Sequence, residues 1–109
     1  MNEVHAIKEH PIAGMIQRHM NRWHFIVAKC YDKRCLDYQW YGARGIGMCQ
    51  EWLDDPALFV AHLLIMPGNR NVGWHFDRED YDGDYTPENT RFVSPQVGCA
   101  NKRQETNRG

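Results

Sequence analysis

The sequence lacks long apolar runs. None approaches the roughly 20 apolar residues that a membrane span requires, so we expect no membrane association. The N-terminal stretch MNEVHAIKEH has no hydrophobic signal segment, which favours a reducing cytoplasm. Internal repeats and low-complexity segments are missing too. The 109 residues are therefore expected to form one small domain, 1–109.

The sequence also has almost no net charge: 13 Lys and Arg against 14 Asp and Glu give a formal charge of −1. Residues 1–50 carry seven basic and four acidic residues, a balance of +3, and residues 51–109 carry six and ten, a balance of −4. Much of this acidity falls in one stretch: Asp77, Glu79, Asp80, Asp82, Asp84 and Glu88. A loop that binds a divalent cation would offset that charge and leave basic groups elsewhere to meet phosphate. An ordinary mixed surface is the alternative.

The four cysteines lack double C-x-x-C spacing. They are Cys30, Cys35, Cys49 and Cys99. In a reducing compartment we expect thiols or metal ligands rather than disulfides. A four-thiolate Zn²⁺ site would stabilise a domain of this size. Plain buried thiols are the alternative, because cysteine is often buried as an apolar residue.

Two segments predict helices. From His10-Pro11 onwards, apolar residues recur at spacings of three and four, at Ile12, Met15, Ile16, His19, Trp23, Ile26, Val27 and Cys30. Asp55-Pro56 begins a second helix that ends before Pro67.

Glycines at 42, 45 and 47 interrupt any regular helix between these segments. Arg44 lies among them, and a cation on such flexible backbone can approach a phosphate backbone closely. A plain glycine-rich turn fits the spacing equally well.

Residues 74–93 predict two strands joined by an acidic loop. Alternation places His75 and Asp77 on one face of the first strand, and residues 90–93 are the second strand. Ser94-Pro95 then begins a helix that would carry Cys99, Asn101, Lys102 and Arg103. A hairpin followed by a helix is the ββα-metal arrangement.

This stretch resembles the HNH endonucleases, in particular the small phage and bacterial type with an Asp-Arg pair where others have His. The residues that carry the resemblance are Asp77, Arg78, Asp80, Gly83, Tyr85, Pro87, Glu88, Asn89, Arg91 and Asn101. A second block, residues 40–52, resembles the upstream part of the same proteins. The resemblance implies an α+β fold, with a helical and Gly-rich part at about 10–66 and a ββα-metal core at about 73–104.

The resemblance also implies an activity, the hydrolysis of phosphodiester bonds in double-stranded DNA. Asp77 and Asn101 match the family's ligand positions for Mg²⁺ or Mn²⁺, and few protein ligands suffice because phosphate and water complete the shell. Arg44, Lys102 and Arg103 would contact DNA. A two-fold DNA site would imply a homodimer. A phage-encoded enzyme would act in the cytoplasm of its bacterial host.

Two residues, Tyr85 and His75, are candidates for the general base. Arg78 stands where the usual His base would be, and Tyr85 matches a loop tyrosine that is the proposed base in related restriction enzymes. Arg78 would favour ionisation of that tyrosine and hold the scissile phosphate. His75, beside Asp77 by strand alternation, is the rival and the better base at neutral pH. We favour Tyr85, and expect Asn89 to fix the loop by hydrogen bonds to its backbone.

Two other functions fit parts of the pattern. Glu79 and Asp84 depart from the family's usual residues, which favours a DNA-binding module that no longer cuts. The loop also resembles a calcium-binding EF-hand at Asp80, Asp82 and Gly83, but its first and last ligand positions would be Arg78 and Asn89.

Overall fold

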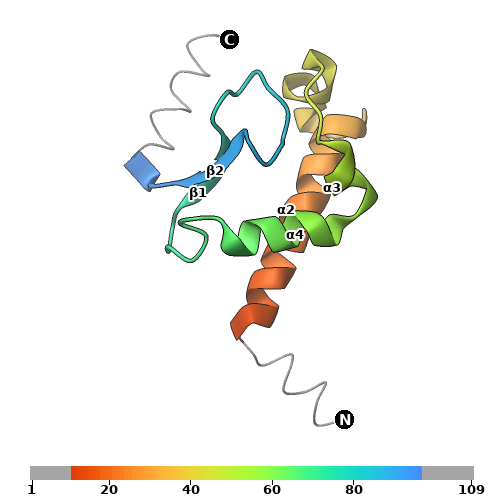
Figure 1. Ribbon diagram of the computed structural model, residues 1–109. Coiled ribbons are helices and arrows are strands. Elements are labelled where there is room, and N and C mark those ends of the chain that lie inside the picture. The colour runs from red at the N-terminus through yellow and green to blue at the C-terminus, as the bar shows by residue number, and fades with distance from the viewer. Residues whose placement is uncertain (1–10, 97–109) are drawn as a thin grey trace.

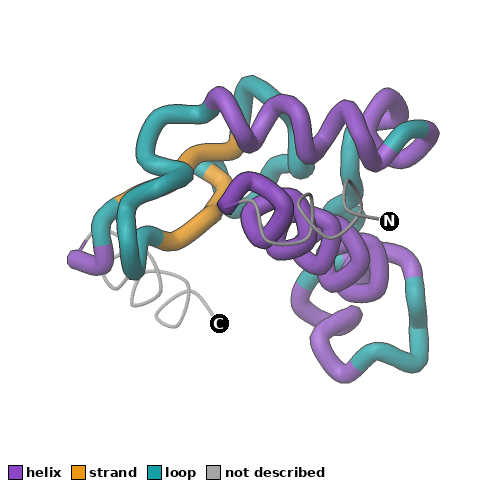
Figure 2. The backbone as a smooth tube through the Cα atoms, turned by 90° about the horizontal axis from the view of Figure 1, so that it is seen from below, coloured by secondary structure: helices purple, strands orange, loops and turns teal. Residues whose placement is uncertain are grey.

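A computed structural model describes residues 11–96 of the chain. In chain order the elements are α2 (Pro11–Tyr31), the 3₁₀ helices η1 (Leu36–Trp40) and η2 (Gly42–Arg44), α3 (Gln50–Asp54), α4 (Pro56–Ile65), β1 (His75–Arg78) and β2 (Thr90–Val93). The fold is a small α+β domain in which α4 lies across α2 and the two strands lie to one side of the helices (Figures 1 and 2). Within residues 11–96, no helix combines the length and the apolar character needed to cross a membrane.

Helix α2 was predicted from its apolar periodicity, and the prediction is confirmed. His19, Ile26 and Cys30 are buried as expected. Ile12 and Ile16 were expected in the core but are exposed. The reason is visible in Figure 1, where the first part of α2 extends beyond α4.

Helix α4 is confirmed as well. The Asp55 side chain caps it by accepting a hydrogen bond from the backbone nitrogen of Ala57 at 3.0 Å. Its Phe59 and Leu63 side chains are fully buried and form the centre of the core. The short helix α3 was not expected, and it contributes Trp52, whose ring meets that of Phe59 edge-on at 5.0 Å.

The hairpin has two different faces. The strands are antiparallel, and the register pairs Phe76 with Phe92 and Asp77 with Arg91. Phe76 packs on Phe92 and on Phe59 of α4, with ring centroids 5.3 and 5.9 Å apart, so its side of the hairpin faces the core. Because side chains alternate along a strand, His75 and Asp77 lie together on the opposite, outer face, as the sequence predicted.

The helix predicted after Ser94-Pro95 lies almost wholly outside residues 11–96. Cys99, Asn101, Lys102 and Arg103 therefore fall outside the described residues.

Candidate functional site

The outer face of the hairpin combines a carboxylate, a guanidinium and an imidazole. Arg91 Nε donates a hydrogen bond to Asp77 Oδ1 at 3.0 Å, and the two side chains are 34% and 24% exposed. His75 lies two residues before Asp77 on the same face of β1. The sequence analysis gave Arg91 no role of its own. The cross-strand register with Asp77 was the missing signal, because directly paired residues share a face.

The loop between the strands is held by Asn89. Its Nδ2 donates to the carbonyl oxygens of Asp80 and Asp84, both at 2.9 Å, and its Oδ1 accepts from the Asp80 nitrogen at 2.8 Å. These are hydrogen bonds of the kind expected from the sequence. Gly83 lies against the same amide, and a Cβ there would be 2.9 Å from Nδ2, so only glycine fits this close approach.

Arg78 lies on the core face, opposite to Asp77. Its side chain is 7% exposed, and Nη1 donates to the Tyr81 carbonyl and, at 2.9 Å, to the Gly83 carbonyl. The guanidinium carbon also lies 5.0 Å from the centre of the Tyr85 ring. We expected Arg78 to hold the scissile phosphate. The guanidinium is turned inwards and supports the loop from within. A phosphate contact by Arg78 stays a prediction.

Tyr85 is also part of the core. It is 5% exposed, and its ring stacks between those of Phe76 and Tyr41, each 6.5 Å away. Burial raises the pKa of Tyr85, and the opposing effect of Arg78 does not compensate. A general base must reach a water molecule and accept its proton at working pH. A buried phenol on the face opposite to Asp77 meets neither condition, which favours His75 over Tyr85 as the candidate base.

The Gly-rich segment lies against the acidic loop. Arg44 forms an ion pair with Asp82, and the Gly47 nitrogen donates to Asp84 Oδ1 at 2.9 Å. Tyr85 extends the contact, because its nitrogen donates to the Gly47 carbonyl at 2.8 Å. Arg44 was expected to be a mobile cation available to DNA. In the structure Arg44 instead neutralises part of the loop's acidity within the chain, and a contact with DNA stays a prediction.

The cysteines are found in different environments. Cys30 is buried, which raises the pKa of its thiol to about 11, and partial burial raises the pKa of Cys49. Cys35 is half-buried. Over residues 11–96, no three side chains of His, Cys, Asp or Glu lie together in a group suited to a metal ion. Zinc binding stays a prediction, because Cys99 lies beyond this range.

Of the two predicted ligands of the divalent cation, Asp77 is the one that lies within residues 11–96. Asp77 is a hard oxygen donor, which suits Mg²⁺, and its carboxylate is partly exposed on the outer face. The bond from Arg91 to Oδ1 fixes the orientation of the carboxylate. The donor chemistry of Asp77 therefore fits the expected cation, and the second ligand, Asn101, is outside the described residues.

Comparison with known proteins yields no match to a family model, to a curated protein or to a solved structure. The functional argument therefore rests on the residues and their geometry.

Proposed function

We propose that the protein is a metal-dependent DNA endonuclease of the HNH type, with its active site on the outer face of the hairpin. One observation carries the proposal: the hairpin brings Asp77, His75 and Arg91 to one face. The helix expected after Ser94-Pro95 would add Asn101 and complete the ββα arrangement. The substrate is double-stranded DNA, for which Lys102 and Arg103 supply phosphate contacts.

In this proposal His75 is the general base. It lies on the face of Asp77 and is partly exposed, so a water molecule can reach it. An imidazole accepts a proton readily at neutral pH, which activates the water for attack on phosphorus. A divalent cation held by Asp77 and Asn101 would stabilise the charge on the phosphorane and the leaving oxygen.

Arg91 has two roles. It orients the Asp77 carboxylate through the bond at 3.0 Å. A guanidinium has five N–H donors, so those not used by Asp77 can bind a phosphate oxygen of the substrate. Arg78 and Asn89 support the site from behind by fixing the loop that joins the two strands.

A plasmid-nicking assay tests the proposal. Supercoiled DNA is incubated with the protein and Mg²⁺, Mn²⁺ or Ca²⁺, and with EDTA as the metal-free comparison. The wild type and Asp37→Asn, a matched control at an exposed carboxylate on η1, should nick the DNA, and Asp77→Asn should not. Equal cutting by Asp77→Asn would refute the assignment.

A DNA-binding module that does not cut is the second candidate. The ion pair between Asp77 and Arg91 favours it, because one carboxylate oxygen is already in use by the protein. The same assay separates the two functions. Under this alternative, the wild type retards DNA in a gel but leaves the plasmid supercoiled with every metal.

A further inference from the structure

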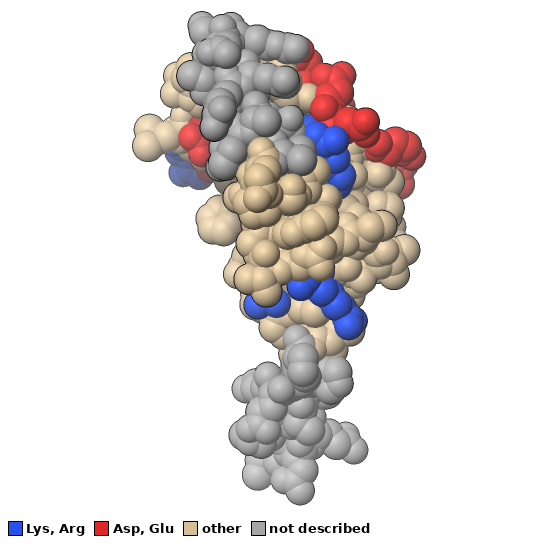
Figure 3. All heavy atoms as spheres, turned by 90° about the vertical axis from the view of Figure 1, so that its left-hand side faces the viewer, with Lys and Arg blue, Asp and Glu red and all other residues tan. Residues whose placement is uncertain are grey.

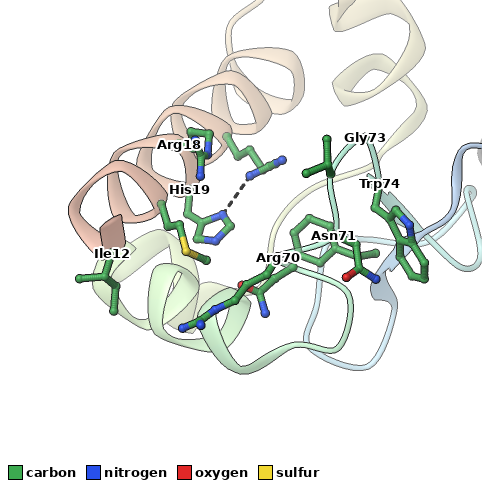
Figure 4. Close-up of a pocket in the computed structure, with 12 residues that line it drawn as sticks. Ile12, Arg18, His19, Arg70, Asn71, Gly73 and Trp74 are labelled. Atoms are coloured by element: carbon green, nitrogen blue, oxygen red, sulfur yellow. Dashed lines mark hydrogen bonds between the residues drawn. The ribbon is translucent and has the colours of Figure 1, made fainter. Parts of the chain in front are cut away.

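A pocket lies between helix α2 and the loop that precedes β1. Its volume is about 720 Å³, within the range of roughly 300 to 1,000 Å³ that small-molecule sites occupy. We call it the arginine pocket, since Arg18, Arg22 and Arg70 line it together with His19 and Asn69. Figure 4 shows Arg18 and His19 projecting from α2 and Arg70 from the opposite loop.

Among residues 11–96, the wall of the arginine pocket contains three arginines and no carboxylate. Among the described residues, Arg34, Arg44 and Arg91 are paired with carboxylates. Arg18, Arg22 and Arg70 have no ion pair with any described residue. The charge of Arg18 lowers the pKa of Arg22, and like charges without an acidic partner among the described residues repel one another. An anion beside them would offset that repulsion.

His19 adds a hydrogen-bond donor to this wall. Arg22 Nη1 lies 3.0 Å from His19 Nδ1, and a guanidinium can only donate, so Nδ1 is the acceptor. Burial, and then the charges of Arg22 and Arg18, lower the pKa of His19 to about 4, so the ring is neutral at pH 7. Its proton is therefore on Nε2. That N–H is buried, and no described residue accepts from it.

Asn69 adds an acceptor. Its Nδ2 donates to the Met66 carbonyl, and its Oδ1 is buried without a partner among the described residues. A buried polar atom without a partner has lost its hydrogen bond to water and gained none in return, which is unfavourable. The arginine pocket thus has one unused donor and one unused acceptor beside three cations, a set that a ligand with both acidic oxygens and donor groups would satisfy.

We propose that the arginine pocket binds a nucleotide, as a free molecule or as one unit of a DNA strand. Its phosphate lies between Arg18 and Arg70 and accepts from His19 Nε2–H, and a base amino group or sugar hydroxyl donates to Asn69 Oδ1. Arg22, which lies over the Phe92 ring at 5.3 Å, is held in place by His19. The proposal does not depend on cleavage at the hairpin.

The loop that covers the arginine pocket can adjust to a ligand. Gly68 and Gly73 flank it, and both have a positive φ, at 85° and 79°. Glycine at both ends lets the backbone rearrange with little steric cost. In this proposal, residues 69–72 move outward and bring the two buried polar atoms into contact with the nucleotide.

The test is calorimetric titration in EDTA with three probes: inorganic phosphate, deoxyadenosine monophosphate and a single-stranded hexanucleotide. The double variant Arg18→Gln/Arg70→Gln should bind the last two probes at least tenfold more weakly, because it loses two charge-assisted hydrogen bonds to the phosphate. Arg34→Gln, an exposed arginine paired with Asp32, is the matched control and should bind like the wild type. Both replaced arginines are exposed, so the double variant should keep its fold by circular dichroism.

The probes also distinguish the source of the nucleotide. A hexanucleotide that binds at least tenfold more tightly than the monophosphate indicates a DNA strand, and equal affinities indicate a free nucleotide. Undiminished binding by the double variant, or no binding of any probe by the wild type, overturns the proposal. Because EDTA prevents metal-dependent cutting, neither result depends on whether the hairpin is a nuclease site.

The imidazole of His19 provides a second measurement. In ¹⁵N spectra of the histidine side chains, the Nε2 signal of His19 should shift on addition of the monophosphate, and that of exposed His24 should not. No change at His19 while the nucleotide binds would place the ligand elsewhere and overturn the proposal.

Discussion

The acidic hairpin loop and the arginine pocket differ in how their charged side chains are paired. In the loop, the side chain or backbone of the same chain meets the acidic groups: Arg44 pairs with Asp82, Arg91 with Asp77, and the Gly47 nitrogen with Asp84. In the arginine pocket, three cations have no such partner among the described residues. Figure 3 shows acidic side chains in the upper part of one face with basic side chains beside them, and a second group of basic side chains lower down, away from the acidic ones. Bonds within the chain can hold the partly paired loop in shape before a ligand arrives, whereas the arginines of the pocket favour the binding of an anion.

The largest effect should come from His75→Gln, which tests whether chemistry occurs on the outer face. Loss of a general base lowers the rate of nicking roughly 10²- to 10⁴-fold. Tyr85→Phe should leave the rate within a few-fold of wild type, because that ring is stacked in the core. Single-turnover nicking rates measure both variants. A dead Tyr85→Phe enzyme beside a normal His75→Gln enzyme would return catalysis to the core face.

Arg78→Met tests whether the loop between the strands depends on the buried guanidinium of Arg78. The substitution keeps most of the side chain's length but leaves the carbonyls of Tyr81 and Gly83 without their buried donor. Each such loss costs about 1 to 3 kcal/mol, so the free energy of unfolding should fall by about 2 to 6 kcal/mol. Urea denaturation measures it. An unchanged midpoint would mean that Arg78 is not a structural support.

The pH dependence of stability tests the neutral His19 in the arginine pocket. Its pKa is about 4 in the folded chain and about 6.5 in the unfolded chain, so the unfolded chain binds more protons between these values. Stability should therefore fall as the pH decreases from 6.5 to 4, by up to about 1.4 kcal/mol per pH unit. His19→Gln should flatten this slope, and His24→Gln, at an exposed position, should not. Thermal melts across this range measure it, and equal slopes for all three proteins would contradict the burial argument.

Arg44→Gln should have the smallest effect. Its pair with Asp82 is largely exposed, with side chains 35% and 55% accessible, and exposed ion pairs contribute about 0 to 1 kcal/mol. Plasmid cutting should stay near the wild-type level, since Arg44 is occupied by the loop. Stability and nicking are both measured, and a large loss of DNA binding with intact stability would restore Arg44 as a DNA contact.

Local patterns predicted much of this fold. The Pro-initiated helices, the strands and the pairing of His75 with Asp77 on one face follow from periodicity and from turn chemistry, which act over a few residues. Three features could not be predicted because they depend on tertiary contacts: the burial of Tyr85, the ion pair of Arg44 with Asp82, and the arginine pocket. Tyr85 lies in a loop without periodicity, so its burial between Tyr41 and Phe76 could not be inferred.

Long-range pairing accounts for the remaining errors. Arg44 and Asp82 are 38 residues apart, and spacing alone cannot predict that they meet. The arginine pocket likewise forms only when α2 lies beside the loop that carries Arg70. Arg22 of this pocket is half-buried over the Phe92 ring, a contact between segments far apart in the sequence.

A parallel β-bridge joins Met48 to Tyr85, so the hairpin is not expected to keep its structure when it is separated from the rest of the chain. In this bridge the Tyr85 nitrogen donates a hydrogen bond to the Gly47 carbonyl, and the Cys49 nitrogen donates to the Tyr85 carbonyl. A peptide cut out at residue 73 would lose both bonds, and a lone two-stranded hairpin is at best marginally stable in water. Because the bridge spans a long loop of chain, the hairpin loop should also acquire its final shape late in folding, after the helices have packed. The hairpin loop therefore depends for its shape on a distant segment of the chain, and the hairpin alone should not hold that shape.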